Sequence, residues 1–209
     1  MMNPNVEMEK LPDRLAERLR GPLPTLVGSR FEPQAFPWRR ATPPIDARPA
    51  AVLMLLYPHE GQWWLPLTLR PDELPVHGGQ ISLPGGAVEP GETDAEAAVR
   101  EFHEELGDDG QPVRLLGKLS PHYVEASDFL VAPWVGVVAA RPKFAPNRVE
   151  VAELLEVPFS VLLDADRLGR QRRSYRGVSY DAPYFRFQSH KIWGATFVML
   201  AQLAVVAET

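Results

Sequence analysis

GAVEPGETDAEAAVREFHEELGD, residues 86–108, is the most informative stretch of the chain. Thr93, followed three residues later by Glu96, forms a capping box, which predicts a helix that begins at Asp94. Gly107 offers a left-handed stop at the other end of the helix. One face of the predicted helix is apolar and would pack on a core; it holds Ala95, Ala98, Val99, Phe102 and Leu106.

Three glutamates project together from this predicted helix. At roughly 100° per residue, Glu101, Glu104 and Glu105 fall within one arc of about 100°, beside the apolar face. Like charges this close disfavour a helix, and they raise the pKa of at least one carboxyl group. A divalent cation removes both penalties, because Mg²⁺ binds carboxylates, waters and phosphate oxygens. The alternative is a solvated acidic face, partly balanced by Arg100 at i,i+4 from Glu96.

The spacing of the whole stretch resembles the Nudix box, G-x5-E-x7-R-E-U-x-E-E-x-G-U, in which U is an aliphatic residue. Two U positions differ, since Phe102 is aromatic and Asp108 is polar, and neither is a charged position of the motif. Through this stretch the chain is similar to the Nudix hydrolase superfamily. The matching positions are Gly86, Glu92, Arg100, Glu101, Glu104, Glu105 and Gly107.

The resemblance implies hydrolysis of a diphosphate that is linked to some other moiety, assisted by Mg²⁺ or Mn²⁺. It implies that the three glutamates of the arc hold the metal, joined by the carbonyl of Gly86. Glu92 and Arg100 would brace the loop onto the helix. The catalytic residues implied in this way are Glu101, Glu104, Glu105 and Arg100.

The general base has two candidates in the sequence. A metal neutralises the non-bridging oxygens of a pyrophosphate and helps to form hydroxide, while a carboxylate accepts the proton of the water. Glu104 is the candidate within the box. Nudix enzymes often take this base from a loop elsewhere, and Glu125, in the segment after Pro121, is the second candidate.

LTLRPDELPVHGGQISLPGG, residues 67–86, resembles the extended signature of the coenzyme A pyrophosphatase branch. The branch carries an arginine where this chain has Pro75, and proline offers neither a charge nor a backbone donor to a phosphate. Pro71 and Leu83 differ as well. The matching positions are Leu67, Thr68, Arg70, Gly79, Pro84, Gly85 and Gly86. The substrate-binding residues implied are Arg70, His77, Gly79, Gly85 and Gly86.

HKIWGAT, residues 190–196, resembles the I-W-G-x-T element that opens the last helix in this branch. Taken alone, these residues are better explained by a buried tryptophan at the start of a core helix; together with the upstream signature they support the branch. Further basic residues that could contact phosphate are Arg170, Arg172, Arg173 and Lys191. Aromatic residues that could stack on adenine, or lie in the core, are Tyr123, Trp134 and Trp193.

Three functions remain open. The first is hydrolysis of coenzyme A or its derivatives to 3′,5′-ADP and a 4′-phosphopantetheine product. The second is the same chemistry on ADP-ribose, a dinucleotide or a nucleoside di- or triphosphate, because Pro75 departs from the branch signature. The third is a noncatalytic nucleotide-sensing module, against which the intact glutamates argue.

Composition limits the partners and the location. The formal net charge is −5 and no face dominated by lysine and arginine is evident, which argues against nucleic acid. There is no cysteine, no apolar signal segment at the start and no apolar stretch long enough to span a bilayer. We therefore expect a cytoplasmic enzyme with a small-molecule nucleotide substrate and no membrane partner. Nudix proteins often form homodimers, and the sequence leaves pairing open.

The periodicity along the chain predicts an α/β fold. Leu11, Leu15 and Leu19 predict a short amphipathic helix, which with a proline-rich connection forms a lead-in over residues 1–49. One Nudix domain would follow over 50–209. Strands are expected at 50–57, 63–70, 113–119, 129–138, 174–180 and 184–187, and helices at 94–106, 159–168 and after 193. The resemblance implies an α/β/α sandwich on a mixed β-sheet.

Overall fold

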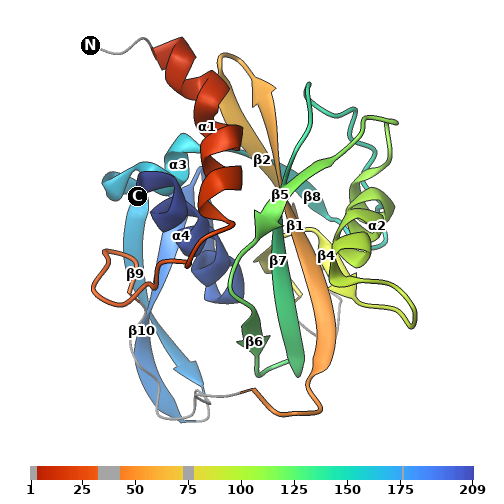
Figure 1. Cartoon of the computed structure of the whole chain (residues 1–209). Coiled ribbons are helices and arrows are strands. Elements are labelled where there is room, and N and C mark those ends of the chain that lie inside the picture. The colour runs from red at the N-terminus through yellow and green to blue at the C-terminus, as the bar shows by residue number, and fades with distance from the viewer. Residues whose placement is uncertain (1–3, 33–42, 73–77, 176) are drawn as a thin grey trace.

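The computed structural model describes residues 4–32, 43–72, 78–175 and 177–209 (Figure 1). The helices are α1 (Pro4–Arg18), α2 (Asp94–Leu106), α3 (Ser160–Leu163), the 3₁₀ turn η1 (Ala165–Arg167) and α4 (Gly194–Glu208). The larger sheet contains β1 (Arg48–His59), β2 (Gln62–Leu69), β3 (Ile81–Ser82), β4 (Gly85–Ala87), β5 (Arg114–Lys118), β6 (His122–Val124), β7 (Phe129–Val137) and β8 (Glu153–Pro158). The smaller sheet contains β9 (Leu168–Tyr175), β10 (Val178–Phe187) and β11 (His190–Trp193).

The larger sheet is mixed, with β1 at its centre. β1 runs parallel to β7, in register from Arg48 opposite Phe129 to Leu56 opposite Val137. It runs antiparallel to β2 at its end, from Tyr57 to His59, and to β4 near its start, from Ala50 to Val52. The mixed sheet predicted for the fold is therefore confirmed, and β4 brings the start of the glutamate-rich stretch directly onto the central strand.

Side chains of β1 alternate between two cores, one on each face of the sheet. Leu53 and Leu55 lie in a cluster with Phe102 and Leu106 of α2. Met54 and Leu56 point the other way, into a cluster formed with α1 and α4. Helices thus cover both faces, with α2 on one side and α1 and α4 on the other (Figure 1). This is the α/β/α sandwich expected from the sequence.

The smaller sheet packs on the outer side of α4, and one strand prediction there was wrong. Phe185 of β10 stacks against Phe197 of α4, with ring centroids 4.8 Å apart. The predicted strand 174–180 runs through the β9–β10 turn, where Gly177 has a φ of 77°. β10 continues from there as one strand, although Pro183 within it argues against a strand in a sequence reading.

The helix predicted over 159–168 was also wrong. α3 ends after one turn, and the side chain of Asp164 accepts a 2.9 Å hydrogen bond from the backbone of Asp166, which starts a separate 3₁₀ turn. Such local side-chain bonds compete with helix propagation. β9 begins directly afterwards at Leu168. The sequence also failed to predict β8, β11, most of β9 and the short strands β3, β4 and β6.

α1 closes the far side of the sandwich by packing on α4. It begins at Pro4, earlier than the predicted leucine-rich segment, and both Leu11 and Leu15 are buried. Arg18 donates hydrogen bonds of 2.8 and 2.9 Å to the carbonyls of Val206 and Ala207. These carbonyls belong to the last turn of α4, where a helix has no further backbone N–H groups to donate to them.

Candidate active site

The loop after β4 and the helix α2 form one hydrogen-bonded unit. The hydroxyl of Thr93 accepts from the backbone of Glu96 at 3.2 Å, and the carboxylate of Glu96 accepts from the backbone of Thr93 at 2.8 Å. The predicted capping box and helix start are confirmed. The start of the helix is therefore fixed by its own side chains.

The end of α2 differs from the expectation. Gly107 has a φ of 89° but a ψ of 153°, so its backbone is not in the left-handed helical region. The last carbonyls of α2 bond instead to the loop that follows β7. Ala145 donates to the carbonyl of Leu106 and Asn147 to that of Glu105, both at 2.8 Å. This loop takes over the role of a helix cap.

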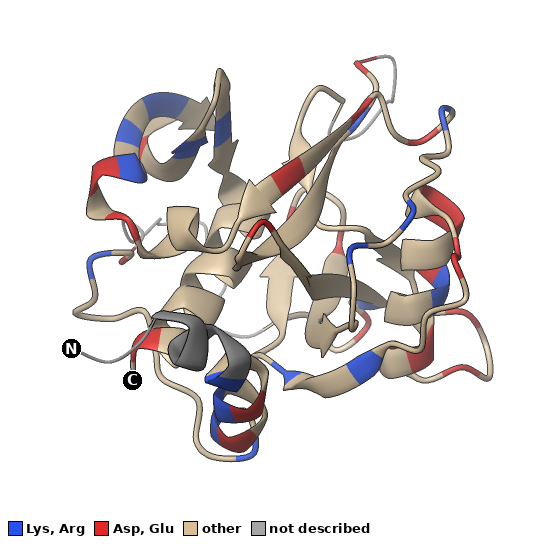
Figure 2. Cartoon of the chain, turned by 90° about the horizontal axis from the view of Figure 1, so that it is seen from above, with Lys and Arg blue, Asp and Glu red and all other residues tan. Residues whose placement is uncertain are grey.

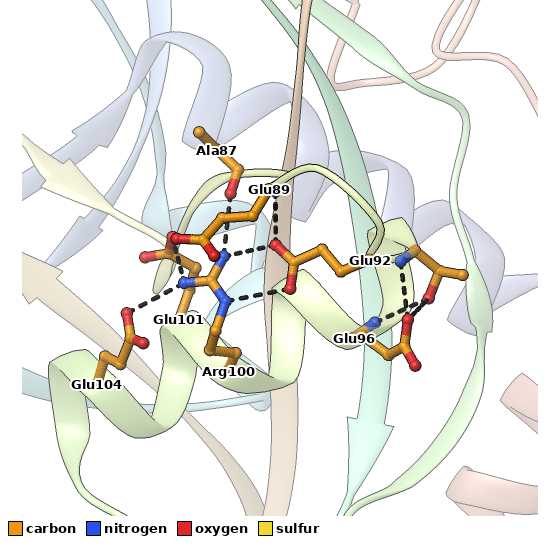
Figure 3. Close-up of polar contacts among 8 residues, drawn as sticks. Ala87, Glu89, Glu92, Glu96, Arg100, Glu101 and Glu104 are labelled. Carbon is orange, nitrogen blue, oxygen red and sulfur yellow. Dashed lines mark hydrogen bonds and ion pairs between the residues drawn. The ribbon is translucent and has the colours of Figure 1, made fainter.

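Arg100 braces the loop against the helix (Figure 3). Its guanidinium donates two hydrogen bonds to the carboxylate of Glu92, at 2.7 and 3.1 Å, and one of 3.1 Å to the carbonyl of Ala87. It also donates to Glu101 at 2.9 Å and to Glu104 at 3.1 Å. The hydrogen bonds from Arg100 lower the pKa of Glu92. The brace implied by the sequence for Glu92 and Arg100 is present.

Gly86 and Glu101 lie in direct contact. A β-carbon at Gly86 would stand 2.4–2.5 Å from the carboxylate carbon and both oxygens of Glu101. The neighbouring Gly85 has a φ of 155°, and a β-carbon there would stand 2.3 Å from the carbonyl oxygen of Ala51 on β1. Only glycine permits both approaches. Burial raises the pKa of the Glu101 carboxyl, against the hydrogen bond from Arg100.

Glu105 is the most buried acidic side chain of the site, with 2% of its surface exposed. Burial raises the pKa of its carboxyl to about 8; the nearby Arg70 guanidinium and a backbone hydrogen bond with Gly85 act in the opposite direction. Within the described part of the chain, its Oε2 atom has no hydrogen-bond partner. A buried carboxylate oxygen without a partner is costly and calls for a counterion or a proton.

Glu150 is a fourth acidic residue of the site that the sequence reading missed. Its charge raises the pKa of both Glu101 and Glu105. It lies in the loop after β7 and accepts a 3.0 Å hydrogen bond from the side chain of Asn147. Because the backbone of Asn147 is bonded to α2, this loop holds Glu150 beside the helix carboxylates.

Comparison with known proteins identifies the family. A family model described as the NUDIX domain matches residues 47–176, which include β1 to β9 and the whole braced loop and helix. The chain belongs to the Nudix family. Its relatives include proteins named uncharacterized Nudix hydrolase NudL. That of Pectobacterium atrosepticum is 37% identical over 183 residues, covering 85% of this chain and 91% of the relative.

Other Nudix proteins are more distant. The NudL of Yersinia enterocolitica is 33% identical over 162 residues, covering 77% of this chain and 76% of the relative. Among solved structures, the Nudix hydrolase RenU from M. smegmatis is 28% identical and aligns with a TM-score of 0.49, over 56% of this chain and 74% of that chain.

The acidic residues of this Nudix chain suit a hard divalent cation by their chemistry. Carboxylates and a backbone carbonyl are the oxygen ligands that Mg²⁺ and Mn²⁺ prefer. The unpartnered Oε2 of Glu105 and the carboxylate of Glu101 over Gly86 are consistent with such a cation. Among the residues that the structure describes, no three acidic or histidine side chains converge on one point. Arg100 donates hydrogen bonds to both Glu101 and Glu104.

The predicted substrate-binding residues separate into two groups. Gly85, Gly86 and Arg70 lie at the carboxylates, where the charge of Arg70 acts on Glu105. Gly79 has a φ of 67°, and its backbone donates to the carbonyl of Arg70 at 3.1 Å, so it turns the chain after β2. His77 lies outside the described residues, as does Pro75.

Other predicted residues lie away from α2 in the chain. Glu125, the second candidate for the base, follows β6 in the turn before β7. Trp134 lies on β7 and is partly buried against the core beneath α2.

Two surface hollows of about 380 and 400 Å³ occur among the described residues. One lies beside α3, and the other lies along α2, where Val99, Arg100 and His103 line it. Neither hollow is lined by Glu101, Glu104 or Glu105, so the candidate site is recognised by its residue types and not by a pocket.

Proposed function

We propose that this Nudix protein hydrolyses the diphosphate of coenzyme A or its derivatives, giving 3′,5′-ADP and a 4′-phosphopantetheine product. The observation that carries the metal-dependent chemistry is the buried, unpartnered Oε2 of Glu105 beside Glu101 and Gly86. The signature over residues 67–86 supports the choice of substrate. Membership of the Nudix family supports the reaction class.

Glu101, Glu104, Glu105 and the carbonyl of Gly86 would hold Mg²⁺ or Mn²⁺. The cation would neutralise the diphosphate oxygens and make a bound water more acidic. Arg100 keeps the loop and the helix in one geometry through its bonds to Glu92 and Ala87. The water oxygen joins one phosphorus, the bond from that phosphorus to the bridging oxygen breaks, and two phosphate monoesters result.

A carboxylate must take the proton that the attacking water loses. Glu104 is 55% exposed at its side chain and accepts one hydrogen bond from Arg100, so its second oxygen is open to water. Glu125 remains the second candidate. Glu150 becomes a third candidate, because the structure holds it near Glu101 and Glu105. Replacing each glutamate by glutamine and measuring kcat against pH distinguishes them, since loss of the base removes the acidic limb of the profile.

A panel of substrates with Mg²⁺ or Mn²⁺, with products identified by mass, tests the proposed function. We expect coenzyme A to be cleaved with a higher kcat/KM than ADP-ribose, dinucleotides or nucleoside triphosphates. Glu105→Gln should lower turnover by about a hundredfold or more while the fold remains intact. If another member of the panel is preferred, the protein is a Nudix pyrophosphatase that acts on ADP-ribose, a dinucleotide or a nucleoside di- or triphosphate. Pro75 in place of an arginine is the sequence feature that favours it. A sensing module would cleave nothing on the panel.

Arg70 offers a sharper test of substrate choice. If it contacts the coenzyme A part of the substrate, Arg70→Ala should lower kcat/KM for coenzyme A relative to ADP-ribose by about tenfold or more, the effect of one charged hydrogen bond. If it acts only through Glu105, both substrates should suffer equally. An equal loss would assign Arg70 to the support of the carboxylates and leave the substrate to be decided by the panel.

The cytoplasmic location, the absence of a nucleic-acid partner and a homodimeric state stay predictions. Among the described residues, no helix combines the length and the apolar character needed to cross a bilayer.

A further inference from the structure

The smaller sheet has one face on α4 and one face turned away from it. Residues that pair across antiparallel strands point to the same side. Phe185 pairs with both Leu168 and Ile192, and this row packs into the core formed with α4. The next row, in which Tyr184 pairs with Gly169 and Trp193, therefore points away from α4.

Cations and aromatic rings share this second face. Alternation from Tyr184 places Arg173, Arg186, Lys191 and Trp193 on it. The guanidinium carbon of Arg173 lies 3.8 Å from the centre of the Trp193 ring, and the Nζ atom of Lys191 lies 5.0 Å from that of Tyr184. We call this set, Arg173, Arg186, Lys191, Tyr184 and Trp193, the outer face.

The charges of the outer face are not balanced. Within the described ranges, no carboxylate lies within ion-pair distance of Arg173, Arg186 or Lys191. By contrast, Arg172 points to the other side of the sheet and pairs with Asp181 at 3.3 Å. The whole chain has a formal charge of −5, so an uncompensated positive face is a local feature (Figure 2). The positive charge of the outer face therefore favours the binding of an anion.

The outer face is tied to the candidate active site through the start of α4. Trp193 ends β11, which lies against β3, and Gly194 turns the chain into the helix with a φ of 70°. The buried hydroxyl of Thr196 donates to the carbonyl of Ile81 on β3 at 2.9 Å. Ile81 precedes Gly85 by four residues, which span at most about 14 Å. The end of β11 therefore lies beside the segment that leads into Gly85 and the carboxylates.

We propose that the outer face binds the nucleotide end of the substrate, an adenosine that carries a phosphate outside the diphosphate. Arginine and lysine suit the extra phosphate, and the Trp193 ring with the Arg173 guanidinium plane suits the base. Tyr184 is buried and supports Lys191 from below. This inference rests on the proposed function, since the substrate must combine an adenine with such a phosphate. It gives residues 190–196 a role in binding besides that of starting a helix.

Direct binding of 3′,5′-ADP to the full chain, measured by calorimetry in EDTA, tests the inference without turnover. We expect Arg173→Ala and Lys191→Gln each to raise the Kd about tenfold or more, and Arg173→Lys to recover part of the loss. 5′-AMP, which lacks the extra phosphate, should bind more weakly to the wild-type protein and be less sensitive to these changes. Arg172→Ala is the matched control, and its affinity should equal that of the wild type.

Thermal unfolding of each variant separates binding from folding, because Arg173→Ala also removes the contact with Trp193. The inference is overturned if Lys191→Gln and Arg173→Ala bind 3′,5′-ADP as tightly as the wild type, or if Arg172→Ala weakens binding equally. If binding depends on Arg173 and Lys191 but coenzyme A is not cleaved, the outer face stands and the proposed function fails. If coenzyme A is cleaved and both variants bind 3′,5′-ADP normally, the proposed function stands and the proposal for the outer face fails.

Discussion

Gly86 shows how the absence of a side chain makes room for a charged one. The carboxylate of Glu101 occupies the position where a β-carbon would stand. No positive φ is required at Gly86, so alanine fits the backbone there and disturbs mainly the end of the Glu101 side chain. The motif glycine and the motif glutamate are thus one physical feature, although they lie fifteen positions apart in the sequence.

Gly86→Ala should therefore displace the carboxylate without unfolding the protein. In the wild type, millimolar Mn²⁺ should raise the Tm, since it binds the folded site. We expect this metal-induced rise to be lost in Gly86→Ala. Gly21→Ala is the matched control, because a β-carbon there makes only an ordinary 3.6 Å contact. A normal rise in Gly86→Ala would show that the position of Glu101 does not govern metal binding.

Glu105 should make the metal-free protein less stable as the pH rises. Its pKa is raised from 4.5 to about 8 by burial, so the folded state holds this proton more tightly than the unfolded chain does. The resulting stability is fully present below pH 4.5 and is lost as the pH rises through about 8. Each tenfold difference in proton affinity between the two states corresponds to about 1.4 kcal/mol, so the loss is on the order of 3–5 kcal/mol.

Denaturant unfolding in EDTA between about pH 5 and pH 8.5 measures this loss. Glu105→Gln has no proton to lose at this position, so the free energy of unfolding should depend less on pH in the variant. If the free energy of unfolding falls with pH equally in the wild type and in the variant, Glu105 is not the residue that causes the loss. In the wild type, added Mn²⁺ should offset the loss at high pH, because it binds the ionised carboxylate.

At the scale of elements, α2 is fixed by bonds at both ends. Thr93 and Glu96 begin it, and the loop with Ala145 and Asn147 ends it. Thr93→Ala should lower the free energy of unfolding by about 1 kcal/mol, the usual effect of losing a helix N-cap. Thr93→Ser keeps the oxygen and should retain most of that stability. Denaturant unfolding of both variants gives the comparison, and equal losses in both would mean that the threonine methyl group matters rather than the cap.

Local patterns predicted the elements that local forces determine. The capping box located the start of α2, and apolar runs located β1, β2, β5 and β7. The mixed sheet followed from the resemblance of residues 86–108 to the Nudix box. Elements that depend on distant partners were not predicted. The two-residue strand β3 is a strand only because β2 lies beside it. The two ends of β10 were predicted, within 174–180 and 184–187, but not its continuity.

The same distinction applies to the candidate site. Glu101, Glu104 and Glu105 share a helical face, so periodicity groups them. Glu150 lies in a loop whose position depends on the backbone bond from Asn147 to α2, and no local pattern marks it. Arg70 was predicted to contact substrate, but its influence on the buried Glu105 required the fold. The roles of all these residues stay predictions until variants are measured.

At the scale of the whole molecule, α1 and α4 join the two ends of the described chain. Arg18→Ala removes two charged hydrogen bonds to the last turn of α4, and should lower the free energy of unfolding by about 1.5–3 kcal/mol. The exposed Arg20→Ala is the control and should be near neutral. Denaturant unfolding checks both, and a neutral Arg18→Ala would mean that water replaces the arginine. The division into a lead-in over residues 1–49 and a domain over 50–209 stays a prediction.

The parallel pairing of β1 with β7 has a consequence for how fast the chain can fold. Arg48 lies opposite Phe129, so all the elements from β2 to β6, α2 included, lie within the loop that this pairing closes. Closing a long loop costs entropy before any contact repays it, and folding slows as contacts become less local. The helix α2 can form its turns early, but its carboxylates gather only when this late pairing places β4 and the β7 loop around them. Recovery of metal binding after dilution from denaturant should therefore lag behind recovery of helical signal.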